Sequence, residues 1–225
     1  MDAILTERER APFEEVADFL MRTGAALPEA ESLILCGALD DVGPGPRTAR
    51  LWRLRCLARS SSALAKSSDG TAFLGIDAGE HCAWRDFDLA QRVRHELDTL
   101  EVAISAHPVA VLRAALRREG RDPAVIDATN LSEQSGQSAV LGIVAASRRV
   151  VTKRGDSMLF LTIEDPSGLA ECTLWPDVYA RFGRLVWDSG LLLASGRVEA
   201  QYGAPTLIVE RLESIVTRGA AALSI

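Results

Sequence analysis

Hydrophobic and polar positions alternate with a period of two along most of the chain from Gly136 onward. Such alternation is typical of strands with one buried face. A helix-like insert, Asp177 to Trp187, separates the third alternating run from the fourth. The predicted strands are 138–147, 157–164, 169–175, 191–199 and 206–212. Five short strands with one helix in this place predict a small Greek-key barrel rather than a β-sandwich.

The earlier part of the chain has helical periodicity instead. Phe13, Val16 and Leu20 form an apolar stripe that Gly24 ends, Pro28 opens a second helix, and a third has Pro46 near its first turn. Two further helices are predicted at about 86–105 and 108–119. The predicted fold class is α+β, with a helical region followed by a five-stranded OB-fold barrel. Its boundaries are a helical region at 1–59, a linker at 60–85, a helical connector at 86–135, the OB-fold at 136–217 and a tail at 218–225.

Large side chains occupy the outer face of the second and third strands. Leu159 and Leu161 fall on the core face, whereas Phe160 falls on the outer face. The expected outer face also carries Met158, Thr162, Thr173 and Trp175. Bases of an unpaired strand can stack on such rings, for roughly 1–3 kcal/mol each. Cover by the linker or by a partner helix is the alternative for some of these positions, and Glu171 on the same face would repel phosphate.

A cationic loop is predicted beside this face, between the first two strands. Arg148, Arg149, Lys153 and Arg154 precede the first acid, Asp156. Tyr202 lies in the loop between the last two predicted strands. In OB-folds these two loops commonly close over the bound strand, and cations there release counterions from phosphates. We expect phosphate contacts, although a solvated loop is the simpler interpretation.

The glycine-proline segment "GPGPRTA" begins at Gly43 and resembles the turn of a helix-hairpin-helix motif. Glycines allow the backbone to approach a phosphate, and the following helix presents free N–H groups. The predicted contact residues are Gly43, Gly45, Arg47, Thr48 and Arg50. A plain helix-helix turn remains the alternative, because the two prolines remove two donors.

Composition restricts the remaining functions. The formal net charge is −6, but residues 136–225 carry nine basic and nine acidic residues, so the deficit lies before them. Cys36, Cys56, Cys82 and Cys172 form no C-x-x-C pair, which argues against a zinc site or a disulfide framework. No cofactor or catalytic residue is expected. No run approaches the ~18–20 apolar residues of a membrane span and no signal peptide is found, so a cytoplasmic protein is expected.

The pair Asp86 and Asp88 could suggest a two-metal site. It stands at the start of a predicted helix, where acids cap free N–H groups and favour the helix dipole. Helix capping is therefore the favoured interpretation.

Several segments together resemble the carboxyl-terminal region of bacterial DNA polymerase III alpha subunits. "TKRGDSMLFLTIEDPSGLAECTLWPDVY" from Thr152 and "LLLASGRVEAQYG" from Leu191 resemble the family's OB domain. "HELDTLEVAISAHPVAVLRAAL" from His95 is similar to the segment before it, including Ser-x-His-Pro at Ser105 to Pro108. "FEEVADFLMRTG" and "LILCGALDDVG" resemble the family's helix-hairpin-helix region.

The resemblance implies that the helical part grips duplex DNA while the OB domain handles the single-stranded template. The family's palm domain with its catalytic aspartates has no counterpart, so the chain is expected to be non-catalytic on its own. The expected partners are single-stranded DNA, duplex DNA and a separately encoded polymerase catalytic chain. A protein-interaction module and one half of a split polymerase remain alternatives. The hairpin is also similar to anticodon-binding OB domains of class II tRNA synthetases, which would not explain the helical half.

Overall fold

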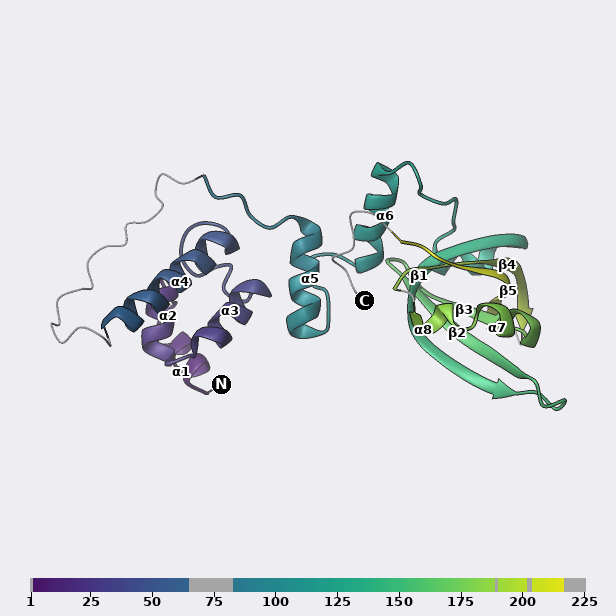
Figure 1. The fold of residues 1–225 in the computed structure, drawn as a ribbon, viewed down its shortest axis with the longest axis horizontal. Coiled ribbons are helices and arrows are strands. Elements are labelled where there is room, and N and C mark those ends of the chain that lie inside the picture. The colour runs from purple at the N-terminus through teal and green to yellow at the C-terminus, as the bar shows by residue number, and fades with distance from the viewer. Residues whose placement is uncertain (1, 65–82, 189, 202–203, 217–225) are drawn as a thin grey trace. The chain divides into compact units, whose positions relative to one another are not determined.

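The computed structural model describes residues 2–64, 83–188, 190–201 and 204–216 (Figure 1). The chain divides into two compact units, Met1–Ser105 and Ala106–Ile225. The first unit is helical and the second contains the barrel, so the predicted α+β class is confirmed. Residues 65–82, which make up most of the predicted linker, lie outside the described residues.

The helical unit surrounds one apolar core. Its helices are α1 (Asp2–Arg10), α2 (Val16–Thr23), α3 (Leu27–Leu35), α4 (Arg47–Leu64) and α5 (Leu89–Leu100). The core is built from Val16, Phe19, Ala30, Ile34, Leu39, Val42, Leu51 and Leu54. Gly24 ends α2 as expected, because its φ of 64° is a left-handed conformation that glycine adopts without penalty.

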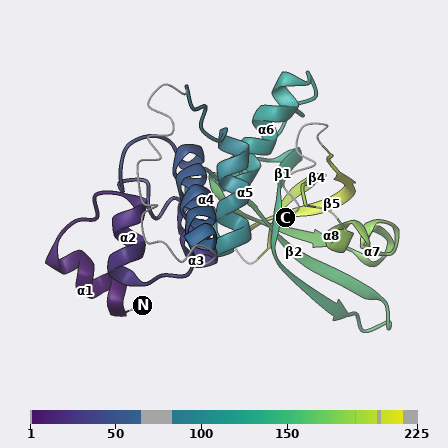
Figure 2. The ribbon, with the colours of Figure 1, turned by 60° about the vertical axis from the view of Figure 1, so that its left-hand side comes forward.

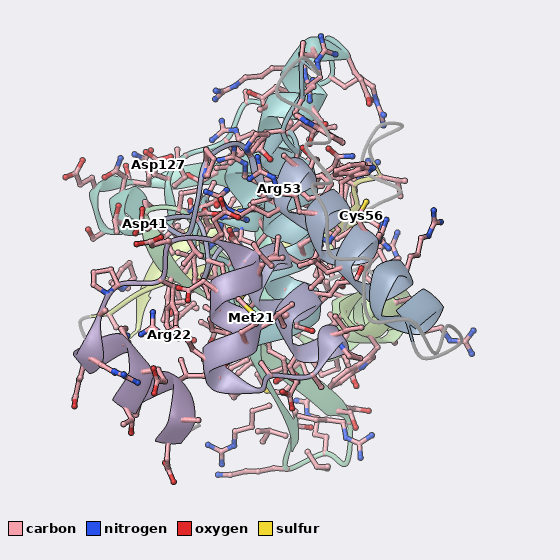
Figure 3. All side chains as sticks on the ribbon, turned by 90° about the vertical axis from the view of Figure 1, so that its left-hand side faces the viewer. Met21, Arg22, Asp41, Arg53, Cys56 and Asp127 are labelled. Atoms are coloured by element: carbon pink, nitrogen blue, oxygen red, sulfur yellow. The ribbon has the colours of Figure 1, made fainter. Side chains whose placement is uncertain are left out.

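The sequence pattern did not predict α1. None of its residues is buried, so it has no apolar stripe to detect. Partly buried Ile4 packs against the core, and Arg22 of α2, labelled in Figure 3, adds polar contacts: Nε donates to Glu7 at 3.1 Å, and the guanidinium lies 4.5 Å from the ring centroid of Phe13. One apolar side chain and one charged side chain therefore join α1 to the core.

Helix α4 continues to Leu64, into the stretch expected to be a linker. One predicted helix end was wrong. The helix expected over 86–105 is shorter, because α5 ends at Leu100 and Glu101 takes a left-handed φ of 59°. The segment after it is held by Glu96, whose carboxylate accepts from the N–H groups of Ile104 and Ser105 at 2.8 Å.

The second unit is a closed barrel preceded by α6 (Pro108–Arg118) and the 3-10 helix η1 (Ala128–Glu133). Its strands are β1 (Gly136–Val151), β2 (Ser157–Asp165), β3 (Gly168–Leu174), β4 (Leu192–Gln201) and β5 (Ala204–Ser214). They close in the order β1-β2-β3-β5-β4, with β3 and β5 parallel. Helices α7 (Pro176–Phe182) and α8 (Leu185–Asp188) lie between β3 and β4. This confirms the predicted barrel and the place of its helical insert.

Inward side chains fill the barrel, including fully buried Leu159, Leu161, Leu174, Leu192 and Leu207. Close strand approach requires glycine at Gly196, since an added Cβ would lie 1.9 Å from the carbonyl oxygen of Ile208. The turn between β2 and β3 is fixed by Asp165, whose Oδ1 accepts from the N–H groups of Ser167 and Gly168 while Oδ2 accepts from Ala128. Burial opposes the charged form of Asp165, yet these hydrogen bonds hold its pKa below the ordinary value.

The strands β1 and β2 continue past the barrel as a long two-stranded arm (Figures 1 and 2). The pairing of β1 with β4 ends at Gly142, and the pairing of β2 with β3 starts only at Leu159. We call residues 148–160 the arm. The tip is a tight turn in which Thr152 donates to Asp156 and Gly155 has a φ of 90°.

Candidate nucleic-acid interface

Strand register places Phe160 in the middle of a row on the outer face of the barrel. Phe160 is opposite Arg148 of β1 and opposite Thr173 of β3. Thr173 is paired with Ile208, which is in turn opposite Arg197. Directly opposite residues of neighbouring strands point to the same face, so these five side chains form one row, which we call the Phe160 row.

The ring of Phe160 is accessible on this row. It is 38% exposed, whereas its neighbours Leu159 and Leu161 are fully buried on the inner face. Trp175, immediately after β3, is 46% exposed. Thr162 is half-buried, and its hydroxyl donates to Glu171 at 3.1 Å. The predicted outward orientation of the phenylalanine is confirmed, and its exposed ring provides a flat apolar contact surface.

Two residues expected on the exposed face are buried. Met158 is 7% exposed, and Thr173 is 1% exposed with a hydroxyl that has no hydrogen-bond partner within the described part of the chain. Met158 is opposite half-buried Val150, and Thr173 lies between Phe160 and the buried Ile208. Neither side chain is open to solvent, so the expectation that they lie on the exposed face is wrong.

The four cations of the arm are all exposed. None of the ion pairs found between described residues includes Arg148, Arg149, Lys153 or Arg154. Register separates the two arginines, because Arg148 is opposite Phe160 on the outer face and Arg149 is opposite Leu159 on the inner face. Only Arg148 therefore adjoins the ring. Tyr202 lies outside the described residues.

The charge of the Phe160 row is uneven. At the far end, Arg197 donates to Glu210 at 3.1 Å and lies 3.9 Å from Glu199. Glu171, two residues before Thr173 on β3 and on the same face, is exposed. Positive charge without an acidic partner therefore remains only at the Arg148 end, which is the favourable side for an anion.

In the helical unit, the predicted phosphate-binding arginines point into the protein. Arg47 is buried, and it donates to Asp40 with Nε at 2.9 Å and with a terminal nitrogen at 2.8 Å. Another terminal nitrogen donates to the carbonyl of Leu35. Arg50 is also buried, and it donates to the carbonyls of Val42 and Gly43 at 2.8 Å. Arg53 donates to the carbonyl of Pro44 from the surface of α4 (Figure 3).

These bonds give the guanidinium groups a structural role, because they satisfy the carbonyl groups of the loop between α3 and α4. The prediction that Arg47 and Arg50 face a ligand is wrong for that reason. The backbone of the loop remains available: Gly43 and Gly45 have φ values of 73° and 90°, and neither N–H has a partner within the described part of the chain. The hydroxyl of Thr48 donates to the carbonyl of Arg85 at 3.1 Å.

Glu96 is a buried charge that sequence analysis did not identify. It lies 3.6 Å from a guanidinium nitrogen of Arg47 and also accepts from the hydroxyl of Ser105. Burial opposes ionisation, yet the bonds from Ser105 and Ile104 and the charge of Arg47 keep the pKa of Glu96 below its ordinary value. The Ser-x-His-Pro segment thus has a structural function: Ser105 binds Glu96, and the ring of His107 accepts from the N–H of Val109 at the start of α6.

The described residues contain no metal site and no membrane-spanning helix. Asp88 caps α5 by accepting from the N–H of Gln91, as predicted, and Asp86 pairs with Arg92 at 2.7 Å. Among described residues, no group of three metal-ligating side chains is found, and no helix is long and apolar enough to cross a membrane. Burial raises the pKa of the Cys172 thiol to about 12, so it stays protonated at neutral pH.

The fold and its domains define a nucleic-acid-binding class of protein. Residues 139–215 match a family profile described as an OB-fold nucleic acid binding domain, and residues 1–49 match one described as a helix-hairpin-helix motif. The arrangement of both in one chain agrees with the observed helical unit and barrel.

The chain is also similar to longer polymerases. An error-prone DNA polymerase of Symbiobacterium thermophilum is 29% identical over 238 residues, covering 96% of this chain and 22% of that protein. A DNA polymerase III subunit alpha of Pseudomonas fluorescens is 26% identical over 225 residues, covering 88% of this chain and 19% of that protein. The predicted relationship to the carboxyl-terminal region of the DNA polymerase III alpha family is confirmed, and the chain spans about a fifth of the length of these relatives.

Among solved structures, the mitochondrial single-stranded DNA binding protein Rim1 of S. cerevisiae covers 37% of this chain and 97% of its own. The two share 12% sequence identity with a TM-score of 0.30. A similarity at this level supports no conclusion about the ligand.

Proposed function

We propose that this chain binds single-stranded DNA across the Phe160 row of the barrel and contributes that binding to a DNA polymerase of the III alpha type. The observation that carries the proposal is the exposed ring of Phe160 beside Arg148, whose charge has no acidic partner among the described residues. An aromatic ring next to a cation offers a base a stacking surface and a phosphate a countercharge.

The geometry favours an unpaired strand. Bases inside a duplex stack on each other, so their flat faces cannot contact a ring on a protein surface. Trp175 and Thr162 would extend the contact along the same face. Glu171 and Glu199 would keep the phosphates near Arg148, because a path over the acids is electrostatically unfavourable.

Duplex DNA would be contacted by the helical unit through its backbone. The N–H groups of Gly43 and Gly45 precede α4, and a helix amino-terminus favours an anion. Pro44 and Pro46 provide no N–H, so these two glycines supply the backbone donors of residues 43–46. Arg47 and Arg50 would support this contact by fixing the loop rather than by touching phosphate.

On its own the chain would not be an enzyme, and a separately encoded chain would supply catalysis. The relatives that match it are polymerases about five times longer, and the match spans nearly all of this chain, including the residues that fit the OB-fold and helix-hairpin-helix profiles. The primary test is primer extension by a catalytic chain lacking these domains. Addition of this chain should raise extension at limiting DNA concentration, and an unchanged rate at every concentration would contradict the polymerase context.

The binding proposal is tested by fluorescence anisotropy with a single-stranded oligonucleotide over a salt series. If Arg148, Lys153 and Arg154 each neutralise one phosphate of a single strand, the slope of log affinity against log salt should be near −2. Phe160→Ala should weaken binding by roughly fivefold to 150-fold, which corresponds to about 1–3 kcal/mol. Phe160→Leu keeps an apolar side chain without the ring and should lose most of the same affinity.

Arg211→Ala is the matched charge control, since Arg211 is exposed and pairs with Glu213 at 3.0 Å away from the arm. It should leave the single-strand affinity within about twofold of wild type, because a side chain that makes no ligand contact adds little at physiological salt. If the affinity for the oligonucleotide did not depend on salt and Phe160→Ala left it unchanged, the barrel would instead be assigned to protein binding.

A further inference from the structure

The inner face of the arm carries an exposed cation, Arg149, that single-strand binding on the Phe160 row does not use. Arg149 is opposite Leu159, and Val151 is opposite Ser157, so both arm side chains point to the inner face. On β1 the inner face leaves the core here: Arg149 is exposed, although the opposite residue Leu159 is buried, and Val151 is 62% exposed. An arm of two strands therefore presents one arginine on each face.

Helix α7 adds charge on the same side of the sheet. It begins directly after Trp175, at the end of the barrel where β2 leaves as the arm, and it packs against β2 (Figures 1 and 2). Val178, Tyr179 and Phe182 rest on the barrel core, so the helix lies on the inner-face side of β2. Its other side exposes Arg181, and Arg184 follows it in the connection to α8.

The balance of charge on this side is positive. We call Arg149, Val151, Arg181 and Arg184 the inner arm surface. Arg181 stacks on Phe182 at 5.1 Å, and none of the three arginines takes part in an ion pair among the described residues. The acids nearby on the same elements are Asp177 and Asp188, while Lys153 and Arg154 at the tip outnumber Asp156. Such a surface attracts a second polyanionic segment.

We propose that the inner arm surface binds the sugar-phosphate backbone of a second DNA strand, so that the arm separates the two diverging strands of a forked DNA. The proposal rests on the proposed function, because the first strand occupies the Phe160 row. A two-stranded ribbon also fits the major groove of an intact duplex. The fork is favoured because Phe160 lies at the base of the arm, where its ring requires an unstacked base.

The test compares three DNA probes by fluorescence anisotropy of the full chain: one single strand, one blunt duplex, and one fork with two non-complementary tails. Wild type should bind the fork more tightly than either of the others. Arg149→Ala should weaken fork binding by roughly threefold to tenfold and leave single-strand binding unchanged. The salt slope on the fork should fall by about 0.7 to 0.9, the contribution of one phosphate.

Arg148→Ala is the matched variant on the opposite face, and it should weaken binding of both the single strand and the fork. Arg211→Ala should change neither. An Arg149→Ala protein that binds the fork like wild type overturns the inference, and so does an equal loss on fork and blunt duplex, which would indicate groove insertion. Failure of the proposed function looks different: Phe160→Ala and Arg148→Ala would both leave single-strand binding unchanged.

The Arg149→Ala protein should fold normally, because Arg149 forms no ion pair with any described residue. Equal thermal midpoints for wild type, Arg148→Ala and Arg149→Ala establish that the comparison concerns binding alone. A double change, Arg149→Ala with Arg184→Ala, should deepen the loss on the fork if both side chains contact the second strand.

Discussion

The arginines of the helical unit and the arginines of the barrel arm have opposite environments. Arg47 and Arg50 are buried, and their donors are used by Asp40, by Glu96 and by carbonyls of the loop between α3 and α4. Arg148 and Arg149 are exposed, and the described residues offer them no acidic partner. A cluster of arginines in a sequence can therefore serve either of two roles: it stabilises the fold when buried, or it is available to bind a ligand when exposed.

The difference follows from the cost of leaving a charge unpaired. A buried guanidinium must be paired and hydrogen-bonded, because water is not there to solvate it. An exposed guanidinium keeps its hydration and is available to a phosphate, at the cost only of screening by salt. Replacing members of the two sets should consequently affect different measurements: unfolding for the first set and DNA binding for the second.

The largest expected effect is a loss of stability when a buried arginine, Arg47 or Arg50, is replaced. Arg47→Ala should destabilise the helical unit by about 3–5 kcal/mol, because it leaves the buried carboxylate of Glu96 without its countercharge and the carbonyl of Leu35 without its donor. Urea unfolding followed by circular dichroism measures this loss.

Arg55→Ala is the control for that change. Arg55 pairs with Glu31 at 2.9 Å on the surface of the same unit, and its loss should cost only about 0–1 kcal/mol. If Arg47→Ala retained wild-type stability but lost duplex binding, the guanidinium would have to reach DNA directly, and the contrast between the two sets would disappear.

A smaller effect is expected from acid. The folded pKa of Glu96 lies below its unfolded value of about 4.3. The stability that Glu96 contributes is therefore fully present above pH of about 4.3 and is lost as the pH falls through the folded pKa. Unfolding curves of wild type from neutral pH to about pH 3 should show this decline.

Glu96→Gln should remove that part of the pH dependence. It should also cost about 1–3 kcal/mol at neutral pH, because a neutral amide is a weaker acceptor for the N–H groups of Ile104 and Ser105. The same pH-dependent decline in the Glu96→Gln protein would assign it to another carboxylate, with Asp165 of the barrel the first to examine.

The sequence was sufficient to predict what depends on local periodicity. Alternation of apolar and polar residues gave the five strands, because a barrel strand has one inner face, and Phe160 was identified by its place on the other face. The ligand-facing role of Arg47 was mispredicted because its burial depends on Glu96, which is 49 residues further along the chain. Only Asp40, one short loop away, was a signal close enough to use.

Met158 and Thr173 show the same limit within the barrel. Their positions on the outer face followed from the alternation, but their exposure depends on neighbours across three strands. Ile208 comes from a distant segment, and the proximity of Val150 to Met158 and of Ile208 to Thr173 is set by register, which the chain pattern alone does not provide. The α1 helix was missed because none of its residues is fully buried: partly buried Ile4 and the charged side chain of Arg22 hold it.

The smallest effect is expected when an exposed arginine of the arm, Arg148 or Arg149, is replaced. It should appear in DNA binding and not in stability. Arg148→Ala should change the free energy of unfolding by less than about 0.5 kcal/mol, because an exposed side chain without an ion pair supports little of the fold. On single-stranded DNA it should reduce the salt slope by about 0.7, the contribution of one phosphate. Arg197→Ala removes a cation from the other end of the Phe160 row, where Glu210 already neutralises it, and should leave the slope unchanged. Equal losses for Arg148→Ala and Arg197→Ala would mean that the whole row, rather than the end next to the arm, carries the phosphate path.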